Sequence, residues 1–484
     1  MSITQAMYAG ASALTNLSES ITVIGNNLAN SNTTAFKSSA ASFEDVLIQT
    51  VGNSGAGRAT QVGTGMGLAG VQQNMTQGSF APSVNVTDMS IDGNGFFKVR
   101  DPTGTVATSS TAQQDMFYTR AGSFKQDRSG HLVNASGLIL QGRKVNDQGG
   151  LDTIGDITLP GPIDKLNAQA TTLVTAHVNL DTSTQLIDPG TTWLADDPST
   201  YNFSTSVRVF DSLGFGHSMD LQFRKESDTT WQWQAVLPAG ELANGTPGDT
   251  TKQILSFGSP LAGAPYEVGK LVFDDHGRLS MEGSAPMEVT FSQGATPQQI
   301  LVDFGQAVGT NGDATNDYTK DRLSDPLYAA RLSAVKADTS TSSDSGTTSV
   351  FGGFSTTKLD QNGYSTGTIS KISIDPTGVI SGSYTNSQTK KLYQIGLVEF
   401  ADPAALEQKG GNLFAETISS GQPLPGLPKD SGFGSIVSNA LEQSNVDMSG
   451  EFVRMIATQR GFQANSRIVS VVDGMMEELL SLKR

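Results

Sequence analysis

The stretch ITQAMYAGASALTNLSESITVIGNNL, residues 3–28, carries the pattern that decides the fold. Its apolar face repeats at alternate steps of four and three residues, with a small residue at one step: Ile3, Met7, Gly10, Leu14, Leu17, Ile21, Ile24 and Leu28. This spacing predicts one continuous α-helix of about 40 Å. The other positions are mostly Ser, Thr, Asn, Ala and Gly, and Glu19 is the one charged residue before Lys37. A helix with so little charge is poorly suited to water, so we expect it to pack on several faces.

The C-terminal stretch predicts a second helix of the same kind. Its apolar residues recur every three or four positions, with an earlier group of three: Ile468, Val472, Met475, Leu479 and Leu482, preceded by Phe452, Met455 and Ile456. Asp447 is placed to cap the N-terminus of this helix, and Glu451 begins its charged face. Apolar helices at both chain ends most simply pair with each other. Isolated helices of this composition are marginal in water, so we expect the two ends to fold on assembly.

The sequence between the helices indicates β-structure. Residues 90–99, SIDGNGFFKV, predict a strand, a Gly-Asn-Gly turn and a second strand. Alternating apolar and polar residues predict further strands at 203–210, 219–223, 231–236 and 288–291. Short strands separated by Gly and Pro are typical of sandwiches and barrels. The expected fold class is therefore α+β and multidomain, with paired terminal α-helices forming an inner layer and nested β-rich, sandwich- or barrel-like domains in the middle.

Charge and composition divide the chain into parts. Residues 146–355 hold 26 Asp and Glu against 11 Lys and Arg, whereas the other 274 residues hold 21 against 20. Connectors are indicated by a Gly-rich stretch at 52–70, a Ser/Thr/Gly-rich stretch at 338–353 and prolines within 423–428. We predict four parts: a helical terminal assembly domain of 1–30 and 440–484, a connector of 31–71 and 426–439, an inner split β-domain of 72–145 and 356–425, and an outer acidic β-rich insert domain of 146–355.

Composition also excludes several classes of function. The chain has no Cys, which excludes disulfides, thiol chemistry and zinc sites of the cysteine type. A net charge of −16 argues against nucleic acid and anionic membranes as partners. The sequence contains no run of 18 apolar residues, so it predicts no transmembrane helix. The N-terminal stretch lacks the features of a cleaved secretory signal, so we expect either a cytosolic protein or export by a route that needs no such signal.

The motifs that could carry catalysis favour other interpretations. Residues 65–70, GMGLAG, match the dinucleotide-binding pattern, but the flanking sequence predicts neither the buried strand nor the helix that this pattern requires, so we expect a flexible or β-type Gly loop. The four histidines lie far apart and lack metal-ligand spacing: His131, His177, His217 and His276. The adjacent acids Asp196–Asp197 and Asp274–Asp275 are interpreted as solvated loop charges. We therefore predict no catalytic residue, no metal site and no cofactor.

Long motifs at both ends and within the middle resemble one known family. NNLANSNTTAFK, residues 26–37, resembles the N-terminal segment shared by flagellar rod, hook and hook-associated proteins. SNVD at 444–447 and QRGFQANSR at 459–467 resemble the matching C-terminal segment. Three further motifs resemble the inner β-domain of the same family: IDGNGFFKV at 91–99, YTRAGSF at 118–124 and GNLFAET at 411–417. A fourth, VRVFDSLGFGH at 207–217, resembles a segment of the outer domain of the hook members.

This resemblance implies a structural subunit that the flagellar type III apparatus exports unfolded. The subunit would polymerise into a flexible curved tube, a universal joint that links the basal-body rod to the filament and transmits torque. The implied partners are further copies of the chain, rod and hook-associated junction proteins, and the hook cap and export apparatus during assembly, with neither nucleic acid nor membrane insertion. The implied location is extracellular, in the hook and basal body of a bacterial flagellum.

Two alternatives stay open at this point. A distal rod or hook-filament junction subunit would share the terminal motifs, but the large insert and its FDSLG segment favour the hook. A secreted β-domain enzyme acting on polysaccharide would need two carboxylates roughly 5–10 Å apart in a cleft. The acidic insert offers no positive sign of such a pair.

The predicted assembly interface combines the apolar positions of both helices with polar and aromatic residues of the N-terminal motif. The N-terminal set is Ile3, Met7, Leu14, Leu17, Ile21, Ile24, Leu28, Asn26, Asn27, Asn30 and Phe36. The C-terminal set is Phe452, Met455, Ile456, Ile468, Val472, Met475, Leu479 and Leu482.

Overall fold

The computed structural model describes two compact units of the chain. The described residues are 3–46, 48–54, 58–63, 65–102, 116–146, 149–161, 164–188, 190–255, 269–283, 286–305, 346–430 and 432–482. Unit 1 takes its residues from 1–163, 369–383 and 389–484, and unit 2 takes its residues from 164–368 and 384–388. No helix among the described residues has both the length and the hydropathy of a membrane span.

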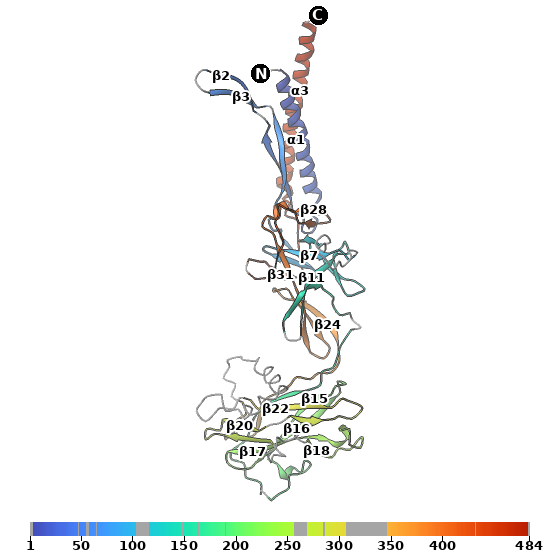
Figure 1. Ribbon diagram of the computed structural model, residues 1–484, viewed down its shortest axis with the longest axis vertical. Coiled ribbons are helices and arrows are strands. Elements are labelled where there is room, and N and C mark those ends of the chain that lie inside the picture. The colour runs from blue at the N-terminus through green and yellow to red at the C-terminus, as the bar shows by residue number, and fades with distance from the viewer. Residues whose placement is uncertain are drawn as a thin grey trace. The chain divides into compact units, whose positions relative to one another are not determined.

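Two long helices lie in unit 1, α1 (Ile3–Ala29) and α3 (Met448–Leu482). They pack side by side, and they are antiparallel because Gly10 lies against Val469 and Leu17 against Gly461 (Figure 1). α3 begins where Asp447 caps it, since the Asp447 carboxylate accepts a hydrogen bond from the backbone N–H of Ser449 at 3.0 Å. The predicted pairing of the chain ends as helices is therefore confirmed.

The β-domain of unit 1 combines strands from both sides of unit 2 in the sequence. Its elements, each assigned to the unit that holds most of its residues, are β1 (Ser39–Asp45), β2 (Ile48–Ser54), β3 (Arg58–Gly63), β4 (Met66–Gln73), β5 (Phe80–Pro82), β6 (Met89–Asp92), β7 (Phe96–Arg100), β8 (Met116–Thr119), β9 (Lys125–Gln126), β10 (Leu132–Val133), β11 (Ile139–Val145), β12 (Leu151–Asp156), β24 (Gly367–Ile374), β25 (Val379–Tyr384), β26 (Thr389–Ile395), β27 (Leu397–Glu399), η4 (Pro403–Ala405), β28 (Glu407–Gly410), β29 (Leu413–Ala415), β30 (Leu424–Gly426), β31 (Ser435–Ser438) and β32 (Ala440–Glu442).

The main sheet of unit 1 joins the two halves of this domain directly. Its strand order is β24-β25-β26-β11-β7-β8-β29-β28, so β11 from the first half pairs with β26 from the second. Ile91, Phe97 and Leu140 from the first half share one buried core with Ile395 and Ile436 from the second. The inner β-domain is thus split in sequence and continuous in space.

The described part of unit 2 consists of strands and two short 3-10 helices. Its elements are β13 (Lys165–Leu166), β14 (Leu173–Asn179), η1 (Pro198–Thr200), β15 (Phe203–Phe210), β16 (Gly216–Lys225), β17 (Thr230–Pro238), η2 (Ala239–Glu241), β18 (Lys252–Ile254), β19 (Gly269–Phe273), β20 (Leu279–Gly283), β21 (Met287–Val289), β22 (Gln298–Asp303) and β23 (Ser355–Gln361). One sheet has the order β15-β16-β17-β19-β20, with β18 on β17, and the other has the order β21-β22-β14-β23. Side chains of both sheets, including Trp231, Trp233 and Ile300, share one core. This arrangement is the β-rich insert that the sequence predicts.

Several predicted boundaries need correction. Unit 2 begins at 164 rather than 146, because β12 pairs with β11 of unit 1, and it continues to 368 rather than 355, because β23 pairs with β14. Residues 440–442, predicted to be helical, form β32 and pair with β5. The predicted connectors contain strands: β1 pairs with β4, and β31 pairs with β6 of the predicted inner β-domain. Residues 66–70 of the GMGLAG motif lie in β4, and residues 338–345 of the Ser/Thr/Gly-rich stretch lie outside the described residues.

Candidate assembly interface

One side of α1 packs closely against α3. Gly10 is buried, and a Cβ atom at this position would lie 2.9 Å from Cγ2 of Val469. A Cβ atom at Gly461 would lie 3.5 Å from Cδ1 of Leu17. A glycine on each helix therefore allows close approach at these two points. Ile24, which is 6% exposed, belongs to the buried part of α1.

Another side of α1 carries polar groups that bind the β1–β4 pair. The Asn27 side chain, in a residue that is 1% exposed, donates to the carbonyl of Ser39 at 2.7 Å and accepts from the N–H of Ser39 at 2.9 Å. Asn16 donates to the carbonyl of Met66 at 2.7 Å. Gly65 has φ +130°, and a Cβ atom there would lie 2.2 Å from Oγ of Ser12. Sequence reasoning missed this contact, although asparagines on a helix with so little charge were an available signal.

The predicted N-terminal interface residues lie largely within this packing. The buried ones are Ile24 and Asn27, and the partly buried ones are Leu14, Leu17, Ile21, Leu28, Asn30 and Phe36. Met7 and Asn26 are exposed, and the side chain of Ile3 lies outside the described part of the structure. Asn26 accepts a hydrogen bond from the Asn30 side-chain amide at 2.9 Å, which supports the last turn of α1.

α3 has an inner face that is buried or partly buried. This face repeats every three or four residues, through Glu451, Met455, Thr458, Gly461, Asn465, Val469, Val472 and Met476. Two predicted interface residues, Met455 and Val472, belong to it. The side chains of two others, Leu479 and Leu482, lie outside the described part of the structure.

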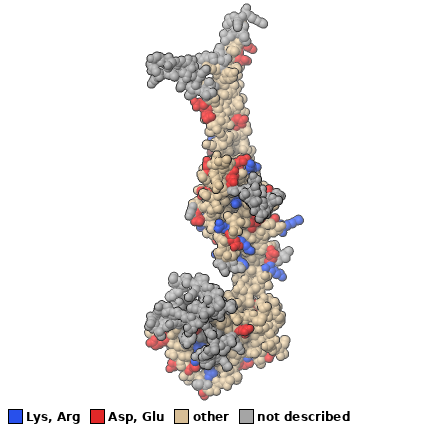
Figure 2. Space-filling view, in the orientation of Figure 1, with Lys and Arg blue, Asp and Glu red and all other residues tan. Residues whose placement is uncertain are grey.

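The remaining predicted residues of α3 are exposed, together with two neighbours that complete a surface. We call this surface the exposed apolar surface of α3: Phe452 (49% exposed), Val453 (67%), Ile456 (51%), Ile468 (47%), Val471 (56%) and Met475 (47%). Figure 2 shows that most of the described surface along the two helices is uncharged on the visible face. Within one chain, α3 thus leaves large apolar side chains in contact with water.

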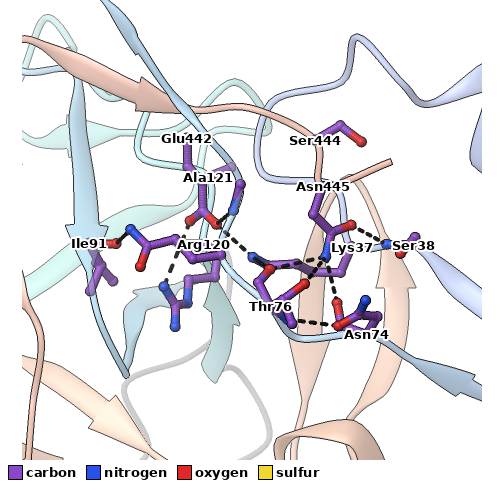
Figure 3. A network of polar contacts seen from close by, with 12 residues as sticks. Lys37, Ser38, Asn74, Thr76, Ile91, Arg120, Ala121, Glu442, Ser444 and Asn445 are labelled. Atoms are coloured by element: carbon purple, nitrogen blue, oxygen red, sulfur yellow. Dashed lines mark hydrogen bonds and ion pairs between the residues drawn. The ribbon is translucent and has the colours of Figure 1, made fainter. Parts of the chain in front are cut away.

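A buried polar network joins the segment after α1 to the segment before α3 (Figure 3). Nζ of Lys37 lies 2.6 Å from Oε1 of Glu442, and these side chains are 1% and 0% exposed. The same carboxylate oxygen accepts the N–H of Gly78 at 3.0 Å, and Lys37 also donates to the carbonyl of Thr76 at 2.7 Å. The network thereby connects residues that are 405 positions apart in the sequence.

Asn445 extends this network toward α3. Its Oδ1 accepts the N–H of Ser38 at 2.8 Å, and its Nδ2 donates to the carbonyl of Asn74 at 2.8 Å (Figure 3). The N–H of Asn445 also donates to the carbonyl of Phe36 at 3.3 Å, so the motifs NNLANSNTTAFK and SNVD meet in space. The bonding of their polar residues within one chain gives these motifs a structural role.

Arg120 adds a second buried cation to the network. Its Nη1 lies 3.7 Å from Oε2 of Glu442, its Nη2 donates to the carbonyl of Gly93 at 2.8 Å, and its guanidinium lies 5.3 Å from the ring centroid of Phe96. Burial lowers the pKa of Lys37 and of Arg120 from their usual values, and the attraction of Glu442 opposes this effect. Sequence reasoning missed Arg120 and Glu442, because the interaction joins three distant segments.

The adjacent acids of unit 2 have local structural roles. Asp197 caps η1 by accepting the N–H of Ser199 at 2.9 Å, and Asp196 accepts the N–H of Lys252 at 3.0 Å. Asp274, Asp275 and His276 form the one cluster of three potential metal ligands among the described residues, with ligand atoms within 4.8 Å of one another. Asp275 and His276 are exposed, and Asp274 makes hydrogen bonds to the turn that it begins.

His217 forms a contact that its sequence spacing did not indicate. Its Nδ1 lies 2.9 Å from Oε2 of Glu241, and its Nε2 lies 3.4 Å from Oδ2 of Asp211. The imidazole stacks on Phe291 with 4.0 Å between the ring centroids. His217 thus connects β16 to η2 and to the turn after β15.

Comparisons with known proteins match this chain from end to end. Four family models match it: "Flagella basal body rod protein" at residues 7–37, "Flagellar hook protein FlgE/F/G D1 domain" at 90–176, "Flagellar basal body protein FlaE D2 domain" at 179–364, and "Flagellar basal body rod FlgEFG protein C-terminal" at 437–482.

Several curated relatives that match over nearly the full length carry the name Flagellar hook protein FlgE. The relative from Borreliella burgdorferi is 32% identical over 494 residues, which cover 99% of each chain. The relative from Treponema pallidum is 31% identical over 99% of this chain and 100% of its own length. The relative from Salmonella typhimurium is 31% identical over 100% of both chains.

Proposed function

The chain belongs to the flagellar hook protein family, and from this membership we propose that α1 and α3 form the surface through which copies of the chain join into the hook. Its function is that of a structural subunit of the bacterial flagellar hook, which links the basal-body rod to the filament and transmits torque for motility. We propose in addition which residues contact neighbouring copies in the polymer.

The exposed apolar surface of α3 carries this proposal. Six large apolar side chains of one helix are 47–67% exposed. An ordinary surface helix places charged residues at such positions, whereas clustered apolar side chains mark sites of protein interaction. Covering them removes apolar area from water, which stabilises contacts by about 25 cal/mol per Å². Another copy of the chain supplies matching apolar helices, since every copy has the same α1 and α3.

The predicted interface residues divide into two roles in this proposal. Residues between α1, α3 and the β1–β4 pair, such as Leu17, Ile24 and Asn27, hold each chain's own ends together. Residues of the exposed apolar surface, such as Phe452, Ile456 and Ile468, contact neighbouring copies. Polymerisation therefore depends on both sets, but substitution in the second set leaves the contacts within one chain intact.

The further partners and the location follow from the hook role. We propose contacts with rod and junction proteins at the two ends of the polymer, with the hook cap and export apparatus during assembly, and an extracellular position. The rod alternative has support from the two terminal family models, whose descriptions name rod proteins. The full-length match to relatives named as hook proteins favours the hook. A catalytic role is not proposed, because Asp196, Asp197 and Asp274 bond to the backbone of their own unit.

A pair of matched substitutions tests the proposed surface. Ile456→Asp changes a residue of α3 that is 51% exposed, and Leu186→Asp changes a residue of unit 2 that is 54% exposed. We expect Ile456→Asp to abolish tube formation in sedimentation and electron microscopy while the β-sheet circular dichroism of the chain is unchanged. Leu186→Asp should form tubes as the unchanged chain does. Normal tubes from Ile456→Asp would overturn the proposal.

A further inference from the structure

The polar network of Figure 3 contains two buried cations for one buried carboxylate. The side chains of Lys37, Arg120 and Glu442 are 1%, 7% and 0% exposed. Lys37 follows α1, Arg120 follows β8, and Glu442 ends β32, so three segments contribute one charge each. Oε2 of Glu442 and both Nε and Nη1 of Arg120 make no hydrogen bond within the described residues.

Net stabilisation does not account for this cluster. Removing three charges from water has a large cost, and an ion pair offsets it only where every polar atom is satisfied. Here three polar atoms lack hydrogen bonds, and burial lowers the pKa of Lys37 in spite of Glu442. Apolar side chains of similar volume can therefore stabilise such a site equally well. The best-attested alternative role of buried charged or polar groups is to fix the register in which two helices or strands pair.

β32 carries Glu442, so the pairing of β32 with β5 shows what a change of register would do to the buried charges. It pairs with β5 through three residue pairs: Ala440 with Pro82, Leu441 with Ala81, and Glu442 with Phe80. Backbone hydrogen bonds continue this ladder on both sides, from Ser83 N–H to the carbonyl of Asn439 at 2.7 Å and from Gln443 N–H to the carbonyl of Ser79 at 2.8 Å. Pro82 has no N–H, so the ladder lacks one donor within β5. A slip by one residue would turn Glu442 to the opposite face of the strand. Lys37 and Arg120 would then be buried without a counter-charge.

The register of β32 also sets the position of α3. α3 begins at Met448, six residues after Glu442, and Asn445 between them is itself bonded to Ser38 and Asn74. A one-residue slip moves a strand by about 3.3 Å, which equals the rise of about two helical residues. Such a shift would carry α3 along α1 and displace Gly461 from Leu17.

We propose that Glu442, held by Lys37 and Arg120, is a positioning residue that fixes the register of β32 and thereby the axial position of α3 against α1. The same cluster makes the docking of the two chain ends mutually dependent. Without β32 in place, docking of residues 31–39 would bury Lys37 near Arg120 with no counter-charge for either cation. The N-terminal segment therefore docks stably only together with the C-terminal segment.

The register is tested by distance measurement in the full chain. The chain has no Cys, so spin labels can be attached at Ser18→Cys on α1 and Ser470→Cys on α3, both exposed positions. Ser470 lies nine residues along α3 from Gly461, which faces Leu17, so the line between the labels runs largely along the helix axis and its length follows an axial shift of α3. We expect one distance in the otherwise unchanged chain. The apolar triple variant Lys37→Met, Arg120→Met and Glu442→Met should stay folded and give a second distance, displaced by about 3 Å. A single unchanged distance in the triple variant would overturn the register role.

The mutual dependence is tested separately by hydrogen exchange, which also applies if the triple variant fails to fold. Glu442→Gln should speed exchange in residues 31–45 and in residues 440–447 together, by about 100-fold or more. Glu442→Asp, which keeps the charge, should restore part of the protection. Asp156→Asn is the control, since it removes the Arg100–Asp156 ion pair elsewhere in unit 1 and should leave both segments unchanged. Faster exchange confined to residues 440–447 would contradict the coupling.

Discussion

Gly10 and Gly25 offer a matched test of how closely α1 and α3 approach. Both glycines lie within α1, so replacing either with Ala favours the helix by about 1 kcal/mol. A Cβ atom at Gly25 has no heavy atom within 4 Å, whereas a Cβ atom at Gly10 would lie 2.9 Å from Cγ2 of Val469. Overpacking of this kind costs about 1–3 kcal/mol. Gly25→Ala should therefore stabilise α1, and Gly10→Ala should be neutral or destabilising.

The difference between the two variants is about 1–3 kcal/mol, which is the overpacking term alone. It corresponds to a roughly 5- to 150-fold difference in the opening equilibrium of α1. Pulsed hydrogen exchange of the α1 amides in assembled tubes, where both chain ends are expected to be folded, measures this difference directly. Tube yield measured in parallel should fall for Gly10→Ala and not for Gly25→Ala. Equal exchange in the two variants would refute the close approach at Gly10.

Four further perturbations have defined outcomes. Ile24→Asp places a carboxylate at a position that is 6% exposed, so tube formation, measured by sedimentation, should be lost. Normal tubes from this variant would contradict the burial of Ile24. Asn27→Ala leaves the backbone of Ser39 without two hydrogen bonds. Hydrogen exchange should show that the packing of α1 on β1 is destabilised by about 1–3 kcal/mol. Asn26 is exposed, so Asn26→Ala is the control and should change the exchange rates little. Asp197→Ala removes the cap of η1 and should lower the urea midpoint of unit 2 slightly, with tube yield unchanged. Loss of tubes would place an assembly contact at Asp197. Burial, with a smaller effect of Glu416, raises the pKa of Tyr118 to about 12, so stability should fall as pH rises from about 10 toward 12, because the unfolded chain releases this proton first. Absorbance titration of the folded chain should show a late tyrosine ionisation that Tyr118→Phe removes, and an unchanged titration of the Tyr118→Phe variant would contradict it.

The helices were predictable because their pattern is local and long. The four-three spacing from Ile3 to Leu28 specifies α1 without any knowledge of the rest of the chain. Asp447 marks the start of α3 in the same way, since capping is a property of neighbouring residues. The strands at 203–210 and 231–236 were also found from local alternation.

The missed features depend on partners that are distant in the sequence. β12 belongs to unit 1 because it pairs with β11, and its composition does not distinguish it from the strands of the acidic insert. Glu442 lies in a stretch that resembles the start of a helix, and its partner Lys37 is 405 positions away. For the interface, apolar spacing identified both helices. It could not separate the residues that pack within one chain, such as Val472, from those that stay exposed, such as Ile468.

Electron cryo-microscopy of the purified polymer tests the central claim most directly. Our account predicts that side chains of neighbouring copies lie within about 4.5 Å of Ile456 and Val471, residues that are 51% and 56% exposed in the single chain. It also predicts that Gly10 still packs against Val469 within each chain. A polymer in which the exposed apolar surface of α3 faces water, with copies joined through unit 2 instead, would contradict the account.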